Sequence, residues 1–200
     1  MSESESSADV RSETQKSPSF GAGGVTLHIR PATPDDAALL HQLAAATFPL
    51  ACPPDALPAS IEAFIAANLS MDSFRAYLSD PARVLFVGEI DGAASGYTMV
   101  VFGEPGDADA AASVTTRPTA ELSKCYALPT AHGSGLAAAM VTTSVQAARD
   151  RGARSMWLGV NRQNDRANRF YEKQGFTVVG TKRFLVGQRY EDDFVRALEL

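Results

Sequence analysis

The sequence has few of the residues that build metal centres and disulfide frameworks. Its 200 residues include only two cysteines and three histidines. Cys52 and Cys125 form neither a CxxC pair nor a disulfide pattern. No cluster of His, Cys and Asp has the spacing of metal ligands, so we expect no metal site. Two unpaired thiols fit a reducing compartment, and we expect a cytoplasmic protein.

Long apolar runs and an excess of positive charge are also missing. No apolar stretch reaches the length needed to cross a membrane, and the Ser- and Glu-rich beginning lacks the apolar core of a signal peptide. The net charge of −5 argues against nucleic acid as a partner. We therefore expect neither a membrane nor a nucleic acid to be bound. The hydrophobic fraction of 45% is ordinary for a globular protein.

The chain divides into a polar beginning and one patterned region. Residues 1–24 carry no hydrophobic period and end in a glycine-rich run, which predicts a disordered tail. Residues 25–200 predict one α/β domain in the order β-α-α-β-β-β-α-β-α-β-β, with two short helices counted as one region. The predicted strands are 25–30, 84–89, 94–102, 117–128, 155–161, 176–186 and 192–198. The predicted helices are 33–47, 60–68, 72–78, 136–151 and 165–173, and residues 103–116 are predicted to form a loop.

A glycine-rich turn, residues 131–137 (AHGSGLA), separates a predicted strand from the longest predicted helix. Backbone N–H groups at a helix N-terminus lack partners, and the helix dipole adds partial positive charge there. Gly133 and Gly135 carry no Cβ, so a pyrophosphate can approach the backbone closely. The turn therefore predicts a site for a phosphorylated ligand.

Three classes of phosphorylated ligand compete for this turn. A P-loop requires GxxxxGK[ST], which the chain does not contain. Gly133, Gly135 and Ala138 do spell the dinucleotide pattern GxGxxA. That pattern also needs an acidic residue closing the next strand, and residues 155–161 (SMWLGVN) end without one. Coenzyme A is the third class, and the sequence that follows favours it.

Residues 164–176 (NDRANRFYEKQGF) form the second informative pattern. Here the chain resembles the GNAT N-acetyltransferase superfamily, in which an acetyl-CoA loop, [QR]xxGx[GA], precedes a helix with the pattern NxxAxx[FL]YxxxGF. The helix pattern matches at Asn164, Ala167, Phe170, Tyr171, Gly175 and Phe176. The loop pattern matches at Gly135 and Ala137, whereas His132 replaces the usual Gln or Arg, so we expect a weaker or pH-sensitive phosphate contact there. The resemblance spans residues 27–200.

The resemblance implies a single GNAT-like domain with a mixed, mostly antiparallel sheet that is flanked by helices and split near its middle. It implies transfer of the acetyl group of acetyl-CoA to a primary amine by direct attack, without a covalent enzyme intermediate. Backbone N–H groups of residues 125–127 would polarise the thioester. The implied acetyl-CoA contacts are Cys125, Tyr126, Ala127, His132, Gly133, Ser134, Gly135, Leu136, Ala137 and Asn164.

Two catalytic residues are predicted. By resemblance Tyr171 is the general acid, since a phenol can protonate the leaving thiolate. Glu121 begins the strand that faces the acetyl group and is the predicted base. Strand alternation places Glu121, Ser123 and Cys125 on one face. Weaker candidates for the base are Glu89, Glu191 and Asp193.

The acceptor is less defined, and a small-molecule or a peptide amine would fit. Residues 48–54, 61–80 and 184–200 are similar to segments of bacterial spermidine/spermine N-acetyltransferases, which suggests a polyamine. That hypothesis predicts an acidic groove containing Glu104, Glu191, Asp192 and Asp193. The alternatives are a protein N-terminal or lysine acetyltransferase, an antibiotic or amino-acid acetyltransferase, and a non-catalytic acyl-CoA-binding sensor. A homodimer is compatible with each of these.

Overall fold

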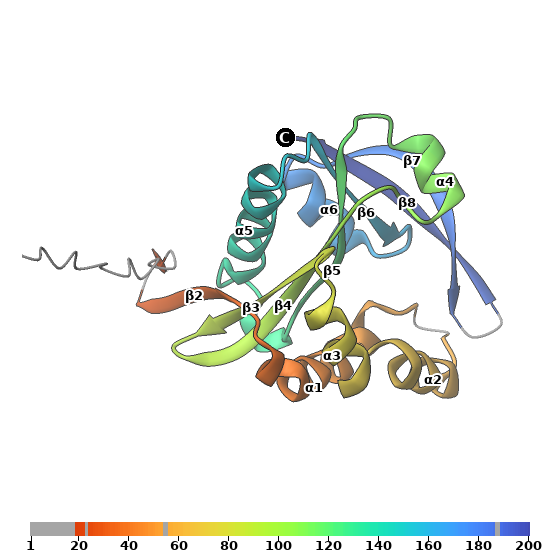
Figure 1. Cartoon of the computed structure of the whole chain (residues 1–200). Helices are drawn as coiled ribbons and strands as arrows, with labels where there is room; N and C mark the ends of the chain where they lie inside the picture. The colour runs from red at the N-terminus through yellow and green to blue at the C-terminus, as the bar shows by residue number, and fades with distance from the viewer. Residues whose placement is uncertain (1–18, 23, 54–55, 187–188) are drawn as a thin grey trace, which may run out of the picture.

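The computed structural model describes residues 19–22, 24–53, 56–186 and 189–200. The described strands form one eight-stranded sheet in the order β1-β2-β3-β4-β5-β6-β8-β7 (Figure 1). Neighbouring strands are antiparallel, except that β5 and β6 are parallel. Their bounds are β1 (Ser19–Ala22), β2 (Val25–Pro31), β3 (Arg83–Ile90), β4 (Ala93–Phe102), β5 (Thr119–Ala127), β6 (Ser155–Asn161), β7 (Thr177–Val186) and β8 (Arg189–Glu199).

Helices cover both faces of the sheet, so the predicted α/β class and its mixed, mostly antiparallel sheet are confirmed. On one face lie α1 (Ala37–Thr47), α2 (Pro58–Asn68) and α3 (Met71–Ser79), and on the other lie α5 (Leu136–Asp150) and α6 (Asp165–Lys173) (Figure 1). Each face buries its own apolar cluster, with Leu40 and Phe74 on the first and Met156 and Phe176 on the second. Burial of such side chains stabilises the sandwich by about 1.5–3 kcal/mol each.

Two described elements were not predicted. Residues 19–22 of the predicted tail form β1, which pairs antiparallel with β2, whereas residues 1–18 and 23 of that tail lie outside the described residues. The predicted loop 103–116 contains α4 (Ala108–Ser113), which is capped by the Asp107 carboxylate as it accepts from the Ala110 N–H at 2.9 Å. Ala110 and Val114 pack with Trp157 beside this helix. Six residues show no readable helical period, so only this packing reveals α4.

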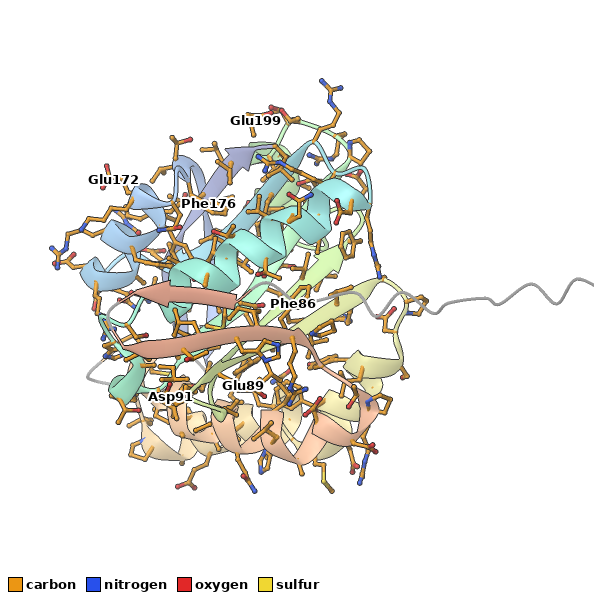
Figure 2. All side chains as sticks on the ribbon, turned by 90° about the vertical axis from the view of Figure 1, so that its left-hand side faces the viewer. Phe86, Glu89, Asp91, Glu172, Phe176 and Glu199 are labelled. Carbon is orange, nitrogen blue, oxygen red and sulfur yellow. The ribbon has the colours of Figure 1, made fainter. Side chains whose placement is uncertain are left out.

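The predicted turns are confirmed by their backbone angles. Asp91 and Gly92 both have positive φ, 50° and 80°, as a type I′ hairpin turn between β3 and β4 requires. Gly135 precedes α5 with a φ of 87°, and Gly175 follows α6 with a φ of 89°. Helix α6 then places Glu172 in solvent, whereas Phe176 after it is fully buried (Figure 2).

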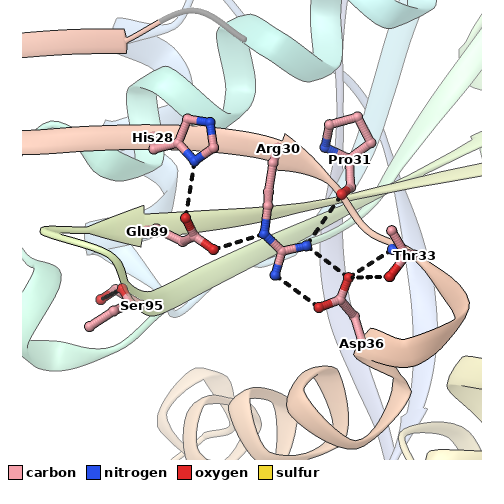
Figure 3. Close-up of polar contacts among 8 residues, drawn as sticks. His28, Arg30, Pro31, Thr33, Asp36, Glu89 and Ser95 are labelled. Carbon is pink, nitrogen blue, oxygen red and sulfur yellow. Dashed lines mark hydrogen bonds and ion pairs between the residues drawn. The ribbon is translucent and has the colours of Figure 1, made fainter. Parts of the chain in front are cut away.

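A polar network ties the beginning of the domain together. Arg30 on β2 donates two 2.8 Å hydrogen bonds to Asp36 and one 2.8 Å bond to Glu89 on β3 (Figure 3). His28 contacts the other oxygen of Glu89 at 3.0 Å. Asp36 also accepts from the N–H and the hydroxyl of Thr33 in the capping box of η1 (Pro34–Asp36). The network fixes the entry of the chain into α1.

Strand β5 pairs irregularly with both of its neighbours, β4 and β6, and these irregularities determine the shape of the site. It pairs with β6 only where residues 119–121 lie beside residues 155–157. Beyond Glu121 the two strands diverge, so the sheet is split near its middle, as expected. Against β4 the register shifts at Ser123, because Leu122 pairs with Val100 while Lys124 pairs with Met99. Ser123 is therefore the extra residue of a β-bulge.

Among the described residues, no helix combines the length and the apolar character that a membrane span requires.

Candidate active site

The larger of two cavities at the split lies on the side of α5 and α6. It has a volume of about 460 Å³. Its walls come from β5, the glycine-rich turn, the first residues of α5, and α6. The predicted acetyl-CoA contacts that line it are Cys125, Tyr126, Ala127, His132, Gly133, Gly135, Ala137 and Asn164, and Tyr171 lines it as well. Segments more than forty residues apart in the sequence therefore meet at one cavity, as the resemblance implies.

The glycine-rich turn uses alternate N–H groups for its own structure. The His132 N–H donates to Pro129 at 3.1 Å, the Ser134 N–H to Ala131 at 3.3 Å, and the Leu136 N–H to the Ser134 hydroxyl at 3.2 Å. In the described part of the chain, the N–H groups of Gly133, Gly135 and Ala137 donate to no residue. A Cβ at Gly133 would have no atom within 4 Å, so the approach to this backbone is open.

Ser134 and Leu136 are the two predicted acetyl-CoA contacts that do not line the cavity. The Ser134 hydroxyl donates back to the Ala131 carbonyl at 2.7 Å, which holds the turn closed. Leu136 is fully buried and packs against Met140 and Leu27 in the core under α5. Both residues hold the turn in shape, and their role as acetyl-CoA contacts stays a prediction. The sequence pattern predicts residues 132–137 as one continuous surface and does not reveal this alternation.

Strand β5 offers backbone donors to the same cavity. The Leu128 N–H donates to the carbonyl of Ser95 on β4 at 2.8 Å. Alternate N–H groups of a strand point to opposite sides, so Tyr126 also points its N–H toward β4, and Cys125 and Ala127 point theirs away. On that side β6 has diverged. Of the three predicted donors, the N–H groups of Cys125 and Ala127 therefore face the split, whereas the N–H group of Tyr126 faces β4.

Tyr171 is held on α6 against the strand. Asn164 begins this helix, and its side chain accepts from the Ala167 N–H at 3.0 Å, which confirms the predicted N-cap. The Tyr171 hydroxyl hydrogen-bonds the thiol of Cys125. Burial raises the pKa of Tyr171 well above its usual 10, so the phenol keeps its proton at any working pH. Burial likewise raises the pKa of the Cys125 thiol to about 12.

A second cavity of about 190 Å³ lies on the side of α1 and α2. It is bounded by η2 (Phe48–Ala51), by β5, and by the ends of β6, β7 and β8. Tyr126 lines both cavities, so a single residue of β5 separates them. The charged residues around the second cavity are Glu121, Lys124, Lys182 and Asp193.

The predicted alternation of β5 is wrong beyond Ser123. Glu121, Ser123, Lys124 and Tyr126 line the second cavity, whereas Cys125 lines the larger one. The bulge at Ser123 is the cause, since one extra residue exchanges the faces of every side chain that follows. Glu121 and Cys125 therefore lie on opposite faces rather than on the same one.

Glu121 has the surroundings of a general base. Burial raises the pKa of its carboxyl, while the nearby Lys182, Lys124 and Arg83 and a hydrogen bond from Ser123 act in the opposite direction. Among the weaker candidates, Asp193 lines the same cavity. Glu89 does not, because it is engaged by Arg30 and His28 on β2. Glu191 belongs to β8, but its side chain lies outside the described residues.

Sequence reasoning missed several residues of the site. Lys124 and Lys182 line the second cavity, and Arg166 on α6 lines the larger one. Lys124 follows Glu121 and Ser123 on a strand of mixed polarity, so its sequence context gave no signal. Desolvation and the neighbouring Arg166 lower the pKa of His132, so its imidazole is neutral at pH 7. Within the described residues no group of three or more His, Cys, Asp or Glu could hold a metal ion.

Comparison with known proteins agrees with this geometry. The model of the acetyltransferase (GNAT) family matches residues 40–176. An uncharacterised N-acetyltransferase of Mycobacterium tuberculosis is 44% identical over 165 residues, which cover 82% of this chain and 98% of that protein. A second uncharacterised N-acetyltransferase, from Lactobacillus delbrueckii subsp. lactis, is 23% identical over 70% of this chain and 79% of its own.

Solved structures share the fold. The PaiA N-acetyltransferase of Thermoplasma acidophilum, in complex with coenzyme A, superposes with a TM-score of 0.68 and 18% identity over 87% of this chain and 99% of its own. The ribosomal-protein-alanine N-acetyltransferase of Brucella melitensis gives a TM-score of 0.63 and 20% identity over 86% and 99%. On the family match and the near-complete alignment with a 44% identical relative, this chain belongs to the GNAT acetyltransferase family and is an acetyl-CoA-dependent N-acetyltransferase.

Proposed function

We propose that the chain transfers the acetyl group of acetyl-CoA to a primary amine by direct attack of the amine on the thioester. Acetyl-CoA would occupy the 460 Å³ cavity, and the amine would enter from the 190 Å³ cavity. The observation that carries the proposal is the position of Tyr126, which lines both cavities. Glu121 lies on the amine side of this residue and Tyr171 on the acetyl-CoA side.

The pyrophosphate of acetyl-CoA fits the glycine-rich turn. The N–H groups of Gly133, Gly135 and Ala137, which donate to no described residue, would bind the pyrophosphate at the start of α5, where the helix dipole also favours negative charge. Arg166 lies on the same cavity and supplies a full positive charge. At the other end, the N–H groups of Cys125 and Ala127 would bind the thioester side of the molecule and stabilise the developing oxyanion. Such a preorganised donor contributes about 3 kcal/mol to catalysis.

Protons move at both ends of the reaction. The amine forms its bond to the acetyl carbon, and Glu121 accepts the proton that the nitrogen gives up, directly or through one water. Its raised pKa makes Glu121 a stronger base than an ordinary glutamate. The C–S bond breaks, and Tyr171 gives its proton to the departing thiolate before regaining one from solvent. Both cavities come from a single chain, so the proposed reaction requires one copy.

Residues 25–200 are proposed to form the catalytic domain, and residues 1–24 are proposed to contribute nothing to the chemistry. No residue before Thr47 lines either cavity among the described residues. The strand β1 lies at the far edge of the sheet, four strands from β5. Its pairing with β2 nevertheless moves the proposed edge of the folded domain from residue 25 to residue 19.

A free-thiol release assay with acetyl-CoA and a panel of amines tests the proposal. Wild-type protein should release coenzyme A only when an acceptor amine is present, and Tyr171→Phe and Glu121→Gln should each be slower by about 10²-fold or more. Glu172→Gln, on the exposed side of α6, serves as the control and should match the wild type. Tight binding of acetyl-CoA without amine-dependent thiol release from any acceptor would instead favour a sensor.

A further inference from the structure

The acceptor cavity has a balanced charge, which does not favour a polyamine. Two carboxylates and two lysines line it. Of the four acidic residues that a polyamine groove was predicted to contain, only Asp193 is among them. Glu104 pairs with Arg117, Asp192 lies in solvent 3.9 Å from Arg162, and the Glu191 side chain lies outside the described residues. A polycation would have to place its positive charges beside Lys124 and Lys182.

The two lysines differ in their surroundings. Lys182 and Asp193 are paired positions on β7 and β8. The Lys182 ammonium and the Asp193 carboxylate both lie within 3.5 Å of the point where a Cβ of Gly159 would be, so two opposite charges are neighbours on this side of the cavity. The charge of Lys182 is thus compensated by the protein itself.

Lys124 has no hydrogen-bonded anion in the part of the chain that the structure describes, although the charge of the nearby Glu121 carboxylate acts to raise its pKa. Its ammonium lies 5.3 Å from the centroid of the Tyr77 ring, and among the described residues it makes no hydrogen bond or ion pair. Arg83 lies over the same ring at 4.7 Å and is itself paired with Asp80. Burial lowers the pKa of Lys124 to about 8, so most of the population is still charged at pH 7. A largely buried ammonium without a hydrogen-bonded anion is costly.

We propose that the acceptor is an amino acid, whose carboxylate binds Lys124 while its amine lies at Glu121. This proposal rests on the proposed function and names the substrate class of the same site. Glu121 and Lys124 stand on one wall, because the bulge at Ser123 brings them to the same face of β5. A molecule with an ammonium next to a carboxylate matches this wall charge for charge. The carboxylate supplies the hydrogen-bonding anion that Lys124 does not have among the described residues, where Glu121 acts on it only through its charge.

The remaining walls suit an apolar side chain of a single residue. Phe48 and Phe64 stack with ring centroids 4.5 Å apart, and Leu69 and Pro53 complete this wall. The cavity of 190 Å³ is smaller than the roughly 300–1,000 Å³ of drug-sized ligand pockets. We therefore chose L-phenylalanine and L-leucine as probes, each with its carboxamide as the matched compound that lacks the carboxylate.

The experiment measures thiol release at pH 8 with L-phenylalanine, L-phenylalaninamide, L-leucine, L-leucinamide, spermidine and an N-terminal alanine peptide. The α-amine of an amino-acid amide is less basic than that of the free amino acid, so a larger fraction of it is neutral at pH 8. Intrinsic reactivity therefore favours the amide. We expect the wild type to prefer the free amino acid by at least about tenfold in kcat/KM, the size of a charge-assisted hydrogen bond. Lys124→Met should remove this preference by raising KM for the amino acids about 10- to 100-fold, with KM for the amides nearly unchanged.

Lys173→Met, at the exposed end of α6, is the matched control and should keep the preference. Equal rates for the amino acids and their amides in the wild type, or a faster reaction with spermidine or with the peptide, would overturn the proposal and leave acetyl transfer intact. The absence of thiol release with every amine would overturn the proposed function as well. The wild-type comparison needs no variant, so it decides the question even if Lys124→Met fails to fold.

Discussion

Glu121 and Lys124 lie on the same wall of the acceptor cavity, although they are three positions apart on one strand. In a regular strand their side chains would point to opposite faces. The extra residue at Ser123 brings the Lys124 side chain to the same face as Glu121, so a carboxylate and an ammonium meet at the cavity. The same shift turns Cys125 to the acetyl-CoA side. The bulge thus divides the side chains of β5 between the two cavities.

Glu121→Gln tests the base. The amide keeps the volume of the side chain and one accepting oxygen but cannot take up a proton as a base, so kcat should fall about 10²-fold or more. Burial raises the pKa of Glu121, and the wild-type rate should fall on the acidic side as this carboxyl becomes protonated. Steady-state kinetics from pH 5 to pH 9 measures both effects. A variant that retains the acidic limb of the wild-type profile would assign that limb to another group.

Tyr171→Phe tests the acid. It removes one hydroxyl and keeps the ring packed against Phe170 and Phe176. The expected loss in kcat is about 10²- to 10⁴-fold, with acetyl-CoA affinity nearly intact, because the hydroxyl acts only on the leaving thiolate. Tyr190→Phe, an exposed tyrosine on β8, is the control. If both variants stay within threefold of the wild type, Tyr171 only packs.

His132 occupies the position where the GNAT loop usually has Gln or Arg. Its lowered pKa leaves it neutral at pH 7.5, and it becomes charged only below its pKa. A bound pyrophosphate favours the charged form, so acetyl-CoA affinity should rise as the pH falls from 7.5 to 5.5. This increase in affinity should be about two- to fivefold larger for the wild type than for His132→Gln, which is the size of an exposed ion pair. Calorimetry at both pH values measures it, and an identical pH dependence in the two proteins would exclude a phosphate contact.

Local chemistry made much of this protein predictable from its sequence. The Asp91-Gly92 turn, the Asn164 cap and the glycines at residues 135 and 175 each fix the backbone within a few residues, and the structure confirms all of them. The GNAT patterns fall on these same short segments. Eight of the ten acetyl-CoA contacts that the pattern predicts line one cavity, the larger of the two at the split.

What the sequence did not reveal depends on pairing between distant segments. The bulge at Ser123 exists only relative to β4, so no period within residues 117–128 reports it. The position of Lys124 in the acceptor cavity follows from that bulge and was missed with it. Helix α4 is similarly defined by its contact with Trp157 rather than by its own six residues. The acceptor side of the site is thus the part that required the structure.

Gly96→Ala should destabilise the fold at the site. A Cβ there would be 2.7 Å from the Tyr126 carbonyl oxygen and 2.9 Å from the Met140 side chain, and the backbone oxygen cannot move without shifting β5. We expect the free energy of unfolding to fall by about 1–3 kcal/mol in urea titrations. Gly106→Ala is the control, since a Cβ at Gly106 meets no atom within 4 Å. Equal stability of the two variants would mean that β5 has room to move.

The ion pair of Arg30 and Asp36 should make the stability of the domain depend on acid. The two 2.8 Å hydrogen bonds from Arg30, with those from Thr33, lower the pKa of Asp36 to about 2. Because the folded pKa lies below the unfolded value of about 3.9, this stabilisation is complete above the unfolded pKa and is lost as the pH falls toward 2. Asp36→Asn should therefore lower the free energy of unfolding at pH 7 by about 2 kcal/mol, and the difference from wild type should shrink between pH 5 and pH 2.

Asp72→Asn breaks the exposed pair with Arg75 and should cost less than about 0.5 kcal/mol at any pH. Urea denaturation across this pH range compares the three proteins, and a difference between Asp36→Asn and wild type that stays constant down to pH 2 would show that the carboxylate charge contributes nothing.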